Sequence, residues 1–236
     1  KGHMALIDKA KSYDSHVSAS IFINPLQFND ASDFKNYPKS LDDDIALLSK
    51  HGCDSLFVPD SSILDNIKEI KAPDTALYLC GMNRPGHFDG VLTIVNKLFE
   101  ITKPTRSFFG KKDFQQLTLI KNFVIENNLP IEIISVDTVR ELNGLAMSSR
   151  NNRLSEFDRE KASKLYETLS LIKDNSSNLS NEIIKSHKDE LTKKGFDVDY
   201  LTVCNPMTLK DLGDFNSKPI LVAIAASISG IRLIDN

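Results

Sequence analysis

The segment RSFFGKKDFQQLTLIKNFVIENNLPIEIISV, residues 106–136, decides the fold class. Its apolar ends, at 106–109 and 131–136, predict two short strands. The residues between them predict a helix with one buried face, because apolar side chains recur there at helical spacing: Leu117, Ile120 and Val124. A strand, a helix and a strand in succession predict two parallel strands joined by a right-handed crossover.

The same alternation runs through the first 150 residues. The periodicity predicts strands at 16–23 and 54–58 and helices at 4–13, 40–51 and 88–101. This pattern indicates an α/β fold with a Rossmann-like parallel sheet over residues 1–150. The strand at 16–23 is so apolar that we expect it to be buried in the middle of the sheet. We therefore expect a further strand beside it, supplied by residues that precede Lys1.

The pattern changes after residue 150. We predict helices at 155–173 and from about 181 to Gly195, followed by three strands at 198–203, 220–225 and 231–234. Helices followed by a run of strands are typical of an α+β unit. The sequence thus predicts a second, smaller α+β domain over residues 151–236.

Composition excludes several classes of protein. The 29 basic and 32 acidic residues give a formal net charge of −3, with no basic block, which disfavours a nucleic-acid partner or a polybasic membrane surface. No apolar run approaches the roughly 20 residues needed to cross a bilayer. Cys53, Cys80 and Cys204 lie far apart and form no CxxC pair, so they indicate neither a disulfide framework nor a zinc ribbon. We expect a cytoplasmic protein with reduced thiols.

Polar residues gather where predicted strands end, which is where open α/β sheets bind ligands. Asn24 and Gln27 follow the strand at 16–23, and their amides can both donate to and accept from a hydroxy acid. Lys112 follows the strand at 106–109 and can neutralise phosphate charge. His3 lies at a predicted helix N-terminus, a place that favours anions. These residues predict a site for a phosphate-bearing ligand and a small acid.

Four segments together resemble the pantoate–β-alanine ligase family. They are FINPLQF at 22–28, NRPGHFDG at 83–90, FFGKKDFQQ at 108–116 and TVRELNGLAMSSRN at 138–151. Lys1-Gly2-His3 matches the last three positions of the H-x-G-H signature of the nucleotidyltransferases to which this family belongs. Between Pro59 and Gly81 the chain departs from the family, which usually carries a Met-Tyr-Pro turn there. The resemblance otherwise spans nearly the whole chain.

The resemblance implies ATP-dependent joining of pantoate and β-alanine. ATP would first react with the pantoate carboxylate to give pantoyl adenylate and pyrophosphate. The β-alanine amine would then attack the acyl carbon and release AMP. The resemblance also implies Mg²⁺ bound to ATP as part of the substrate complex, no tightly bound cofactor, and a homodimer.

The same resemblance implies two sets of site residues. On the ATP side these are His3, Gly110, Lys112, Asp113, Met147, Ser148, Ser149 and Arg150, of which His3, Lys112 and Arg150 are the catalytic candidates. On the side of the acid substrates they are Asn24, Gln27, Arg84, His87 and Gln116. Outside the motifs, the carboxylates of Asp43 and Asp44 could hold Mg²⁺, although a solvated helix start explains them more simply.

Two alternatives stay open. Another adenylyltransferase of the same superfamily would transfer AMP to a different acceptor and would release pyrophosphate without pantoate. A non-catalytic nucleotide-binding module would bind ATP and release no pyrophosphate.

Overall fold

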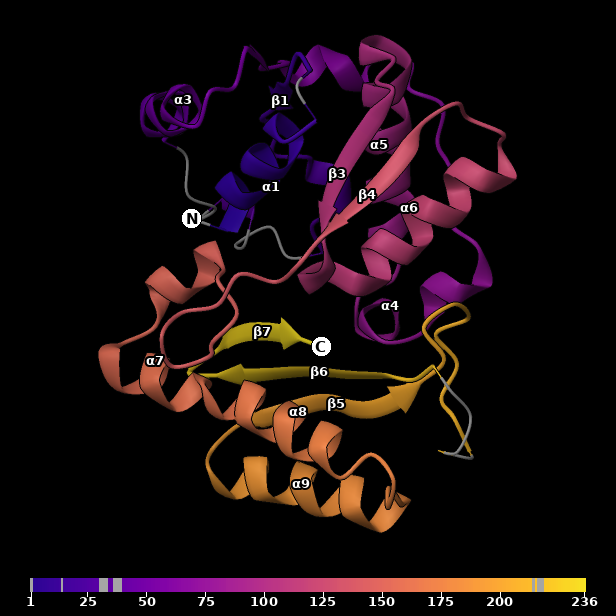
Figure 1. Cartoon of the computed structure of the whole chain (residues 1–236). Coiled ribbons are helices and arrows are strands. Elements are labelled where there is room, and N and C mark those ends of the chain that lie inside the picture. The colour runs from indigo at the N-terminus through magenta and orange to yellow at the C-terminus, as the bar shows by residue number, and fades with distance from the viewer. Residues whose placement is uncertain (1, 14, 30–33, 36–39, 214, 216–218) are drawn as a thin grey trace.

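The computed structural model describes residues 2–13, 15–29, 34–35, 40–213, 215 and 219–236 (Figure 1). Its helices are α1 (Gly2–Lys11), α3 (Leu41–Lys50), α4 (Cys80–Asn83), α5 (His87–Thr102), α6 (Phe114–Glu126), α7 (Glu156–Ala162), α8 (Lys164–Asp174) and α9 (Asn181–Lys193). Its strands are β1 (Ser18–Ser20), β2 (Ser55–Phe57), β3 (Arg106–Gly110), β4 (Glu132–Val136), β5 (Asp197–Cys204), β6 (Leu221–Ile228) and β7 (Ile231–Asp235). Three 3₁₀ turns bear on the site: η1 (Pro25–Gln27), η4 (Lys111–Asp113) and η5 (Ser149–Arg153).

The predicted strand–helix–strand unit is confirmed. β3 pairs with β4 in parallel, with Phe108 opposite Ile134. α5 and α6 pack together beside these strands (Figure 1), and their inward side chains, Leu92, Leu119 and Ile120, are almost completely buried. α6 forms because its apolar residues occupy one face. After α6 the chain turns at Asn128 and Leu129 and enters β4. The α/β class with parallel strands follows from this unit.

The strand predicted at 16–23 is shorter and more exposed than expected. Only β1 forms there, and it pairs in parallel with β2. Within the described ranges β1 has no strand on its other side, and Ser18 and Ser20 are exposed, so one side of this strand lacks the neighbour that the sequence led us to expect from residues before Lys1. Beyond β1 the pairing continues for one more bond, in which the backbone N–H of Ile21 donates to the carbonyl of Phe57 at 3.0 Å. A further strand beside β1 stays a prediction.

The three strands predicted after residue 150 are confirmed as an antiparallel sheet in the order β5-β6-β7. α8 and α9 pack on one face of it, and their core includes the fully buried Ile172 and Ile224. The helix predicted at 155–173 is two helices, α7 and α8, which meet at Ser163. The hydroxyl of Ser163 donates to the carbonyl of Glu160 at 2.6 Å, a local bond that competes with continuous helix.

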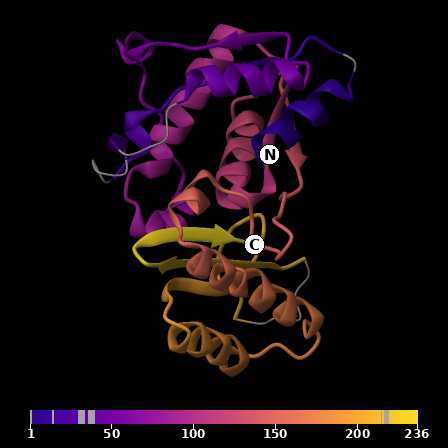
Figure 2. The same cartoon turned by 90° about the vertical axis from the view of Figure 1, so that its left-hand side faces the viewer.

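The other face of this small sheet meets the first part of the chain (Figure 2). Tyr200 and Ile234 pack against the core that holds α5 and α6, and Leu79 shares a separate cluster with Leu221. η4, which follows β3, therefore lies against the end of β7. In the described part of the chain, no helix combines the length and the apolar character that crossing a membrane requires.

Candidate active site

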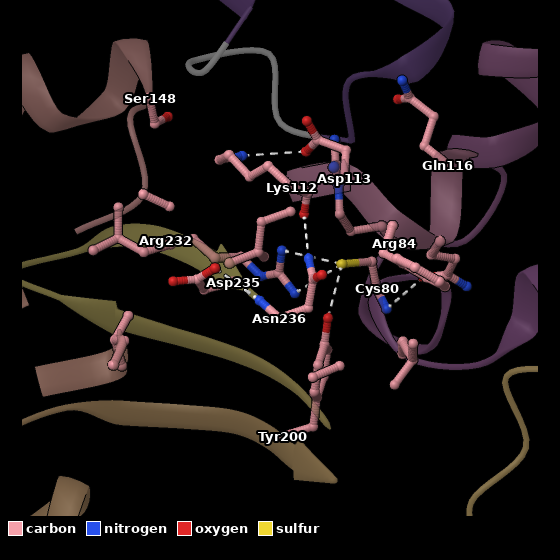
Figure 3. A pocket seen from close by; sticks show the side chains of 18 of the residues that line it. Cys80, Arg84, Lys112, Asp113, Gln116, Ser148, Tyr200, Arg232, Asp235 and Asn236 are labelled. Atoms are coloured by element: carbon pink, nitrogen blue, oxygen red, sulfur yellow. Dashed lines mark hydrogen bonds and ion pairs between the residues drawn. The ribbon is translucent and has the colours of Figure 1, made fainter. Parts of the chain in front are cut away.

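One pocket lies where η4, α5 and α6 of the first part of the chain meet β6 and β7 of the small sheet, and the space that it encloses is about 80 Å³. Seven residues expected from the sequence line it: Arg84, His87, Lys112, Asp113, Gln116, Ser148 and Arg150. These side chains come from three of the four sequence motifs, which the fold brings together from distant parts of the chain (Figure 3).

The cationic side of the pocket is built on η4. Lys112 is mostly buried, and its Nζ donates to Oδ1 of Asp113 at 3.2 Å. The preceding Gly110 ends β3 in extended backbone, and a Cβ atom added there would meet nothing within 4 Å. Gly110 does not itself line the pocket, but the free space beside it leaves room for a ligand to approach the backbone.

The loop at 147–150 adds hydroxyl and guanidinium groups. Ser148 caps η5 by accepting a hydrogen bond from the backbone N–H of Arg150 at 3.2 Å. The buried Asn151 anchors this turn, because its Nδ2 donates to the carbonyl of Ala146 at 3.0 Å and to Glu141 at 2.8 Å. The hydrogen bonds of Asn151 thus hold in place the loop that brings Ser148 and Arg150 to the pocket.

His3 and Met147 do not line the pocket. His3 is exposed in the first turn of α1, and Lys1 of the same match lies outside the described residues. A Cβ atom on Gly2 would lie 3.5 Å from Cβ of Met147, so the start of α1 abuts the loop at 147–150. Ser149 belongs to η5 but does not line the pocket.

Arg84 and His87 form a linked pair at the start of α5. Nη1 of Arg84 donates to Nε2 of His87 at 3.1 Å, and both residues reach the backbone carbonyl of Gln27, at 2.9 Å and 2.7 Å. Burial, followed by the neighbouring positive charge of Arg84, lowers the pKa of His87 from 6.5 to about 4. His87 is therefore neutral near pH 7.

Of the three amide side chains expected to bind the acid substrate, one lines the pocket and two do not. Gln116 on α6 lines the pocket. The side chain of Asn24 is buried and holds the turn, since it accepts from the N–H of Leu26 and donates to the carbonyl of Gly90. Gln27 contacts Asn24 at 3.5 Å and does not line this pocket. The structure therefore joins Gln27 to the site through its backbone carbonyl.

Asp43 and Asp44 lie apart from the pocket, in the first turn of α3. Asp43 is exposed, and Asp44 is half-buried. Across the described residues, no three His, Cys, Asp or Glu side chains gather where they could hold a metal ion. Of the acidic residues in the pocket wall, Asp113 is beside Lys112 and Asp235 is paired with Arg140.

The small sheet contributes a wall that the sequence analysis missed. Sγ of Cys80 lies 3.1 Å from the hydroxyl of Tyr200 and 3.7 Å from both terminal nitrogens of Arg232 (Figure 3). Nε of Arg232 donates to Asp199 at 2.6 Å. Burial, and then the neighbouring Cys80, raise the pKa of Tyr200 above its ordinary value. The signal available in the sequence was Arg232, a charged residue between the apolar residues of β7.

Comparisons with known proteins agree with the motifs. The family described as Pantoate-beta-alanine ligase matches residues 1–236. Proteins named Pantothenate synthetase from Shewanella piezotolerans and Leptospira biflexa are 41% and 42% identical to the chain, covering all of it and 86% of each relative. A pantothenate synthetase structure from Thermus thermophilus is 37% identical, with a TM-score of 0.91 over 99% of this chain and 87% of that one.

A second solved structure adds a bound state. It is a pantoate-beta-alanine ligase from Francisella tularensis complexed with beta-gamma ATP and beta-alanine. It is 36% identical to the chain and has a TM-score of 0.82 over 100% of this chain and 84% of that one.

Proposed function

Because the chain belongs to the pantoate–β-alanine ligase family, we propose that it joins pantoate to β-alanine at the expense of ATP. The observation that carries the proposal is the meeting of three motifs in one pocket. Lys112 and Arg150 supply positive charge there, while Arg84, His87 and Gln116 supply polar groups suited to a hydroxy acid. The bound ATP analogue and β-alanine of the Francisella tularensis relative support the same substrates here.

The first step makes the carboxylate reactive. An oxygen of the pantoate carboxylate attacks the α-phosphorus of ATP, and the bond from that phosphorus to the bridging oxygen of pyrophosphate breaks. Negative charge grows on the transferred phosphate and on the leaving pyrophosphate. Lys112 and Arg150 stabilise that charge, and the backbone beside Gly110 gives the nucleotide close access. Mg²⁺ would enter with ATP as part of the substrate complex.

The second step forms the amide. The amine nitrogen of β-alanine attacks the acyl carbon of pantoyl adenylate, the bond from that carbon to the AMP oxygen breaks, and the nitrogen loses a proton. His87 is not the base for that proton, because both of its ring nitrogens are hydrogen-bonded and its pKa is about 4. His87 instead orients Arg84 and the carbonyl of Gln27 toward the acid side of the pocket. The reaction proceeds by positioning, with no covalent enzyme intermediate.

The family also leads us to propose a homodimer located in the cytoplasm. The three cysteines, which are free in the structure, support a reducing compartment. Sedimentation of the purified chain over a range of concentrations tests the dimer, and fractionation of cells that express it tests the location.

Product analysis tests the function. Pyrophosphate should appear from ATP only when pantoate is present, and AMP and pantothenate should appear only after β-alanine is added. Pyrophosphate released without pantoate would favour another adenylyltransferase of the superfamily. ATP binding with no pyrophosphate under any condition would indicate a non-catalytic nucleotide-binding module.

A further inference from the structure

The side chain of Asn236 reaches from the end of β7 to the turn that carries Lys112. Its Nδ2 lies 2.9 Å from the backbone carbonyl of Lys111 and 2.9 Å from that of Lys112 (Figure 3). An amide nitrogen carries two hydrogens, so this one side chain donates both of them to consecutive carbonyls of η4. The contact fixes the direction of the peptide groups on either side of Lys112.

Asn236 is itself held in place by a buried carboxylate. Its backbone N–H donates to Oδ1 of Asp235 at 2.8 Å. Asp235 is 4% exposed and receives two hydrogen bonds from the guanidinium of Arg140, at 2.5 Å and 2.9 Å. Such two-pronged pairs between a guanidinium and a carboxylate are strong and have a defined geometry. The amide of Asn236 is therefore presented from a rigid base.

The contacts that hold Asp235 continue to a helix that packs on the small sheet. The guanidinium of Arg140 lies 3.8 Å from the ring centre of Tyr166 on α8, and Nη1 also donates to the carbonyl of Gly144 at 3.1 Å. A continuous set of contacts thus runs from α8 through Arg140 and Asp235 to η4. It joins the small sheet to the lysine that faces the pocket.

We infer that Asn236 is a positioning residue that sets the place of the Lys112 ammonium in the pocket. A 3₁₀ turn of three residues has few backbone hydrogen bonds of its own, so contacts from outside decide its geometry. The inference rests on the proposed function, in which Lys112 stabilises phosphate charge. A displacement of about 1 Å at such a group is enough to slow a reaction by about a hundredfold.

The change Asn236→Asp tests this at constant shape. It replaces the donating nitrogen by an oxygen that faces two carbonyl oxygens. We expect pyrophosphate release to slow by about tenfold or more and the KM for ATP to rise, with the KM for pantoate within about twofold. The matched control is Asn175→Asp, since Nδ2 of Asn175 also donates to a backbone carbonyl, that of Leu171, but on an exposed helix end. The control should keep the wild-type rate.

A double-mutant cycle with Lys112→Ala separates positioning from a general structural role. Once Lys112→Ala has removed the ammonium, there is no group left to position. Adding Asn236→Asp to Lys112→Ala should therefore lower the rate of pyrophosphate release by less than about twofold. An equal cost in both backgrounds, or a loss explained by a smaller folded fraction in thermal melts, would overturn the inference.

A failure of the proposed function can be distinguished from a failure of the inference about Asn236. If the wild-type chain releases no pyrophosphate with pantoate, the ligase proposal is wrong, and the same cycle is measured by ATP binding. The inference then requires that Asn236→Asp weakens ATP binding only while Lys112 is present. Effects that add across the two changes, or a wild-type chain that does not bind ATP, would contradict it.

Discussion

Nε2 of His87 accepts a hydrogen bond from Arg84, while Nδ1 of the same ring lies 2.7 Å from the carbonyl oxygen of Gln27. A guanidinium has no acceptor and a carbonyl has no donor, so both contacts are satisfied only by the neutral ring with its proton on Nδ1. Protonation of Nε2 would place a second positive charge against Arg84 in a buried site. The pair therefore makes stability depend on pH.

The first prediction concerns that dependence. The pKa of His87 is about 4 in the folded chain and about 6.5 in an unfolded chain, so the unfolded state binds more protons between these values. The free energy of unfolding should therefore fall as the pH is lowered from 6.5 toward 4, by about 2 kcal/mol at pH 5. Urea unfolding of the wild type and of His87→Gln at pH 7 and pH 5 measures it. A fall of the same size in both proteins would show that His87 is not the source.

The second prediction concerns phosphate charge. Lys112→Ala and Arg150→Ala should each slow adenylate formation by about a hundredfold, a usual cost of losing a donor to a transition state. The melting temperature should stay near that of the wild type, because both side chains line the pocket. Lys164→Ala serves as the control, since that lysine pairs with Glu167 on the exposed side of α8. An early melt with an unchanged rate would make Lys112 or Arg150 a structural residue.

The third prediction contrasts two adjacent glutamines. Gln116→Leu should raise the KM for pantoate by about tenfold or more, because loss of the amide leaves polar groups of the substrate unpaired. The KM for ATP should change far less. Initial rates at varied pantoate and ATP distinguish the two effects, and equal changes in both constants would argue against a role in acid binding.

Gln115 gives the matched comparison for stability. It is 5% exposed, its Oε1 accepts from the N–H of Cys80 at 3.0 Å, and its Nε2 donates to the carbonyl of Tyr78 at 2.7 Å. Gln115→Leu should lower the free energy of unfolding by about 2–4 kcal/mol, because two buried backbone groups lose their partners. Chemical unfolding of both leucine variants tests the contrast, which fails if Gln116→Leu is the less stable protein.

The fourth prediction separates two glycines of the motifs. Gly110→Ala should fold normally, since its added Cβ meets nothing, but it should weaken ATP binding by entering the space left for the nucleotide. Gly90→Ala should be strongly destabilised, because its Cβ would lie 2.3 Å from the carbonyl oxygen of Leu26 and η1 would have to move. Thermal melts with and without ATP test both. A destabilised Gly110→Ala would show that the glycine serves the fold instead.

Much of the fold could be predicted from the sequence, because its signals are local. The apolar period along 106–136 is present in the chain before any contact forms, and the parallel pairing of β3 with β4 follows from the crossover. Two elements differ in extent: only β1 forms within 16–23, and the helix predicted at 155–173 is divided into α7 and α8. The apolar residues at 16–23 indicate a strand, but the length over which it pairs depends on the neighbouring strands, which no local pattern reports.

In the candidate site, too, local features could be predicted and long-range contacts could not. Lys112, Arg150 and Gln116 could be named as candidates for phosphate and acid binding from the sequence, because each lies in a compact motif. That Gln27 offers its carbonyl, and that Cys80 meets Tyr200, 120 positions away, could be seen only in the folded chain. The fold alone placed the amide of Asn236 on the carbonyls of Lys111 and Lys112, 125 and 124 positions away. Such contacts depend on how the small sheet packs on the parallel strands, and residues so far apart leave no shared periodicity in the chain.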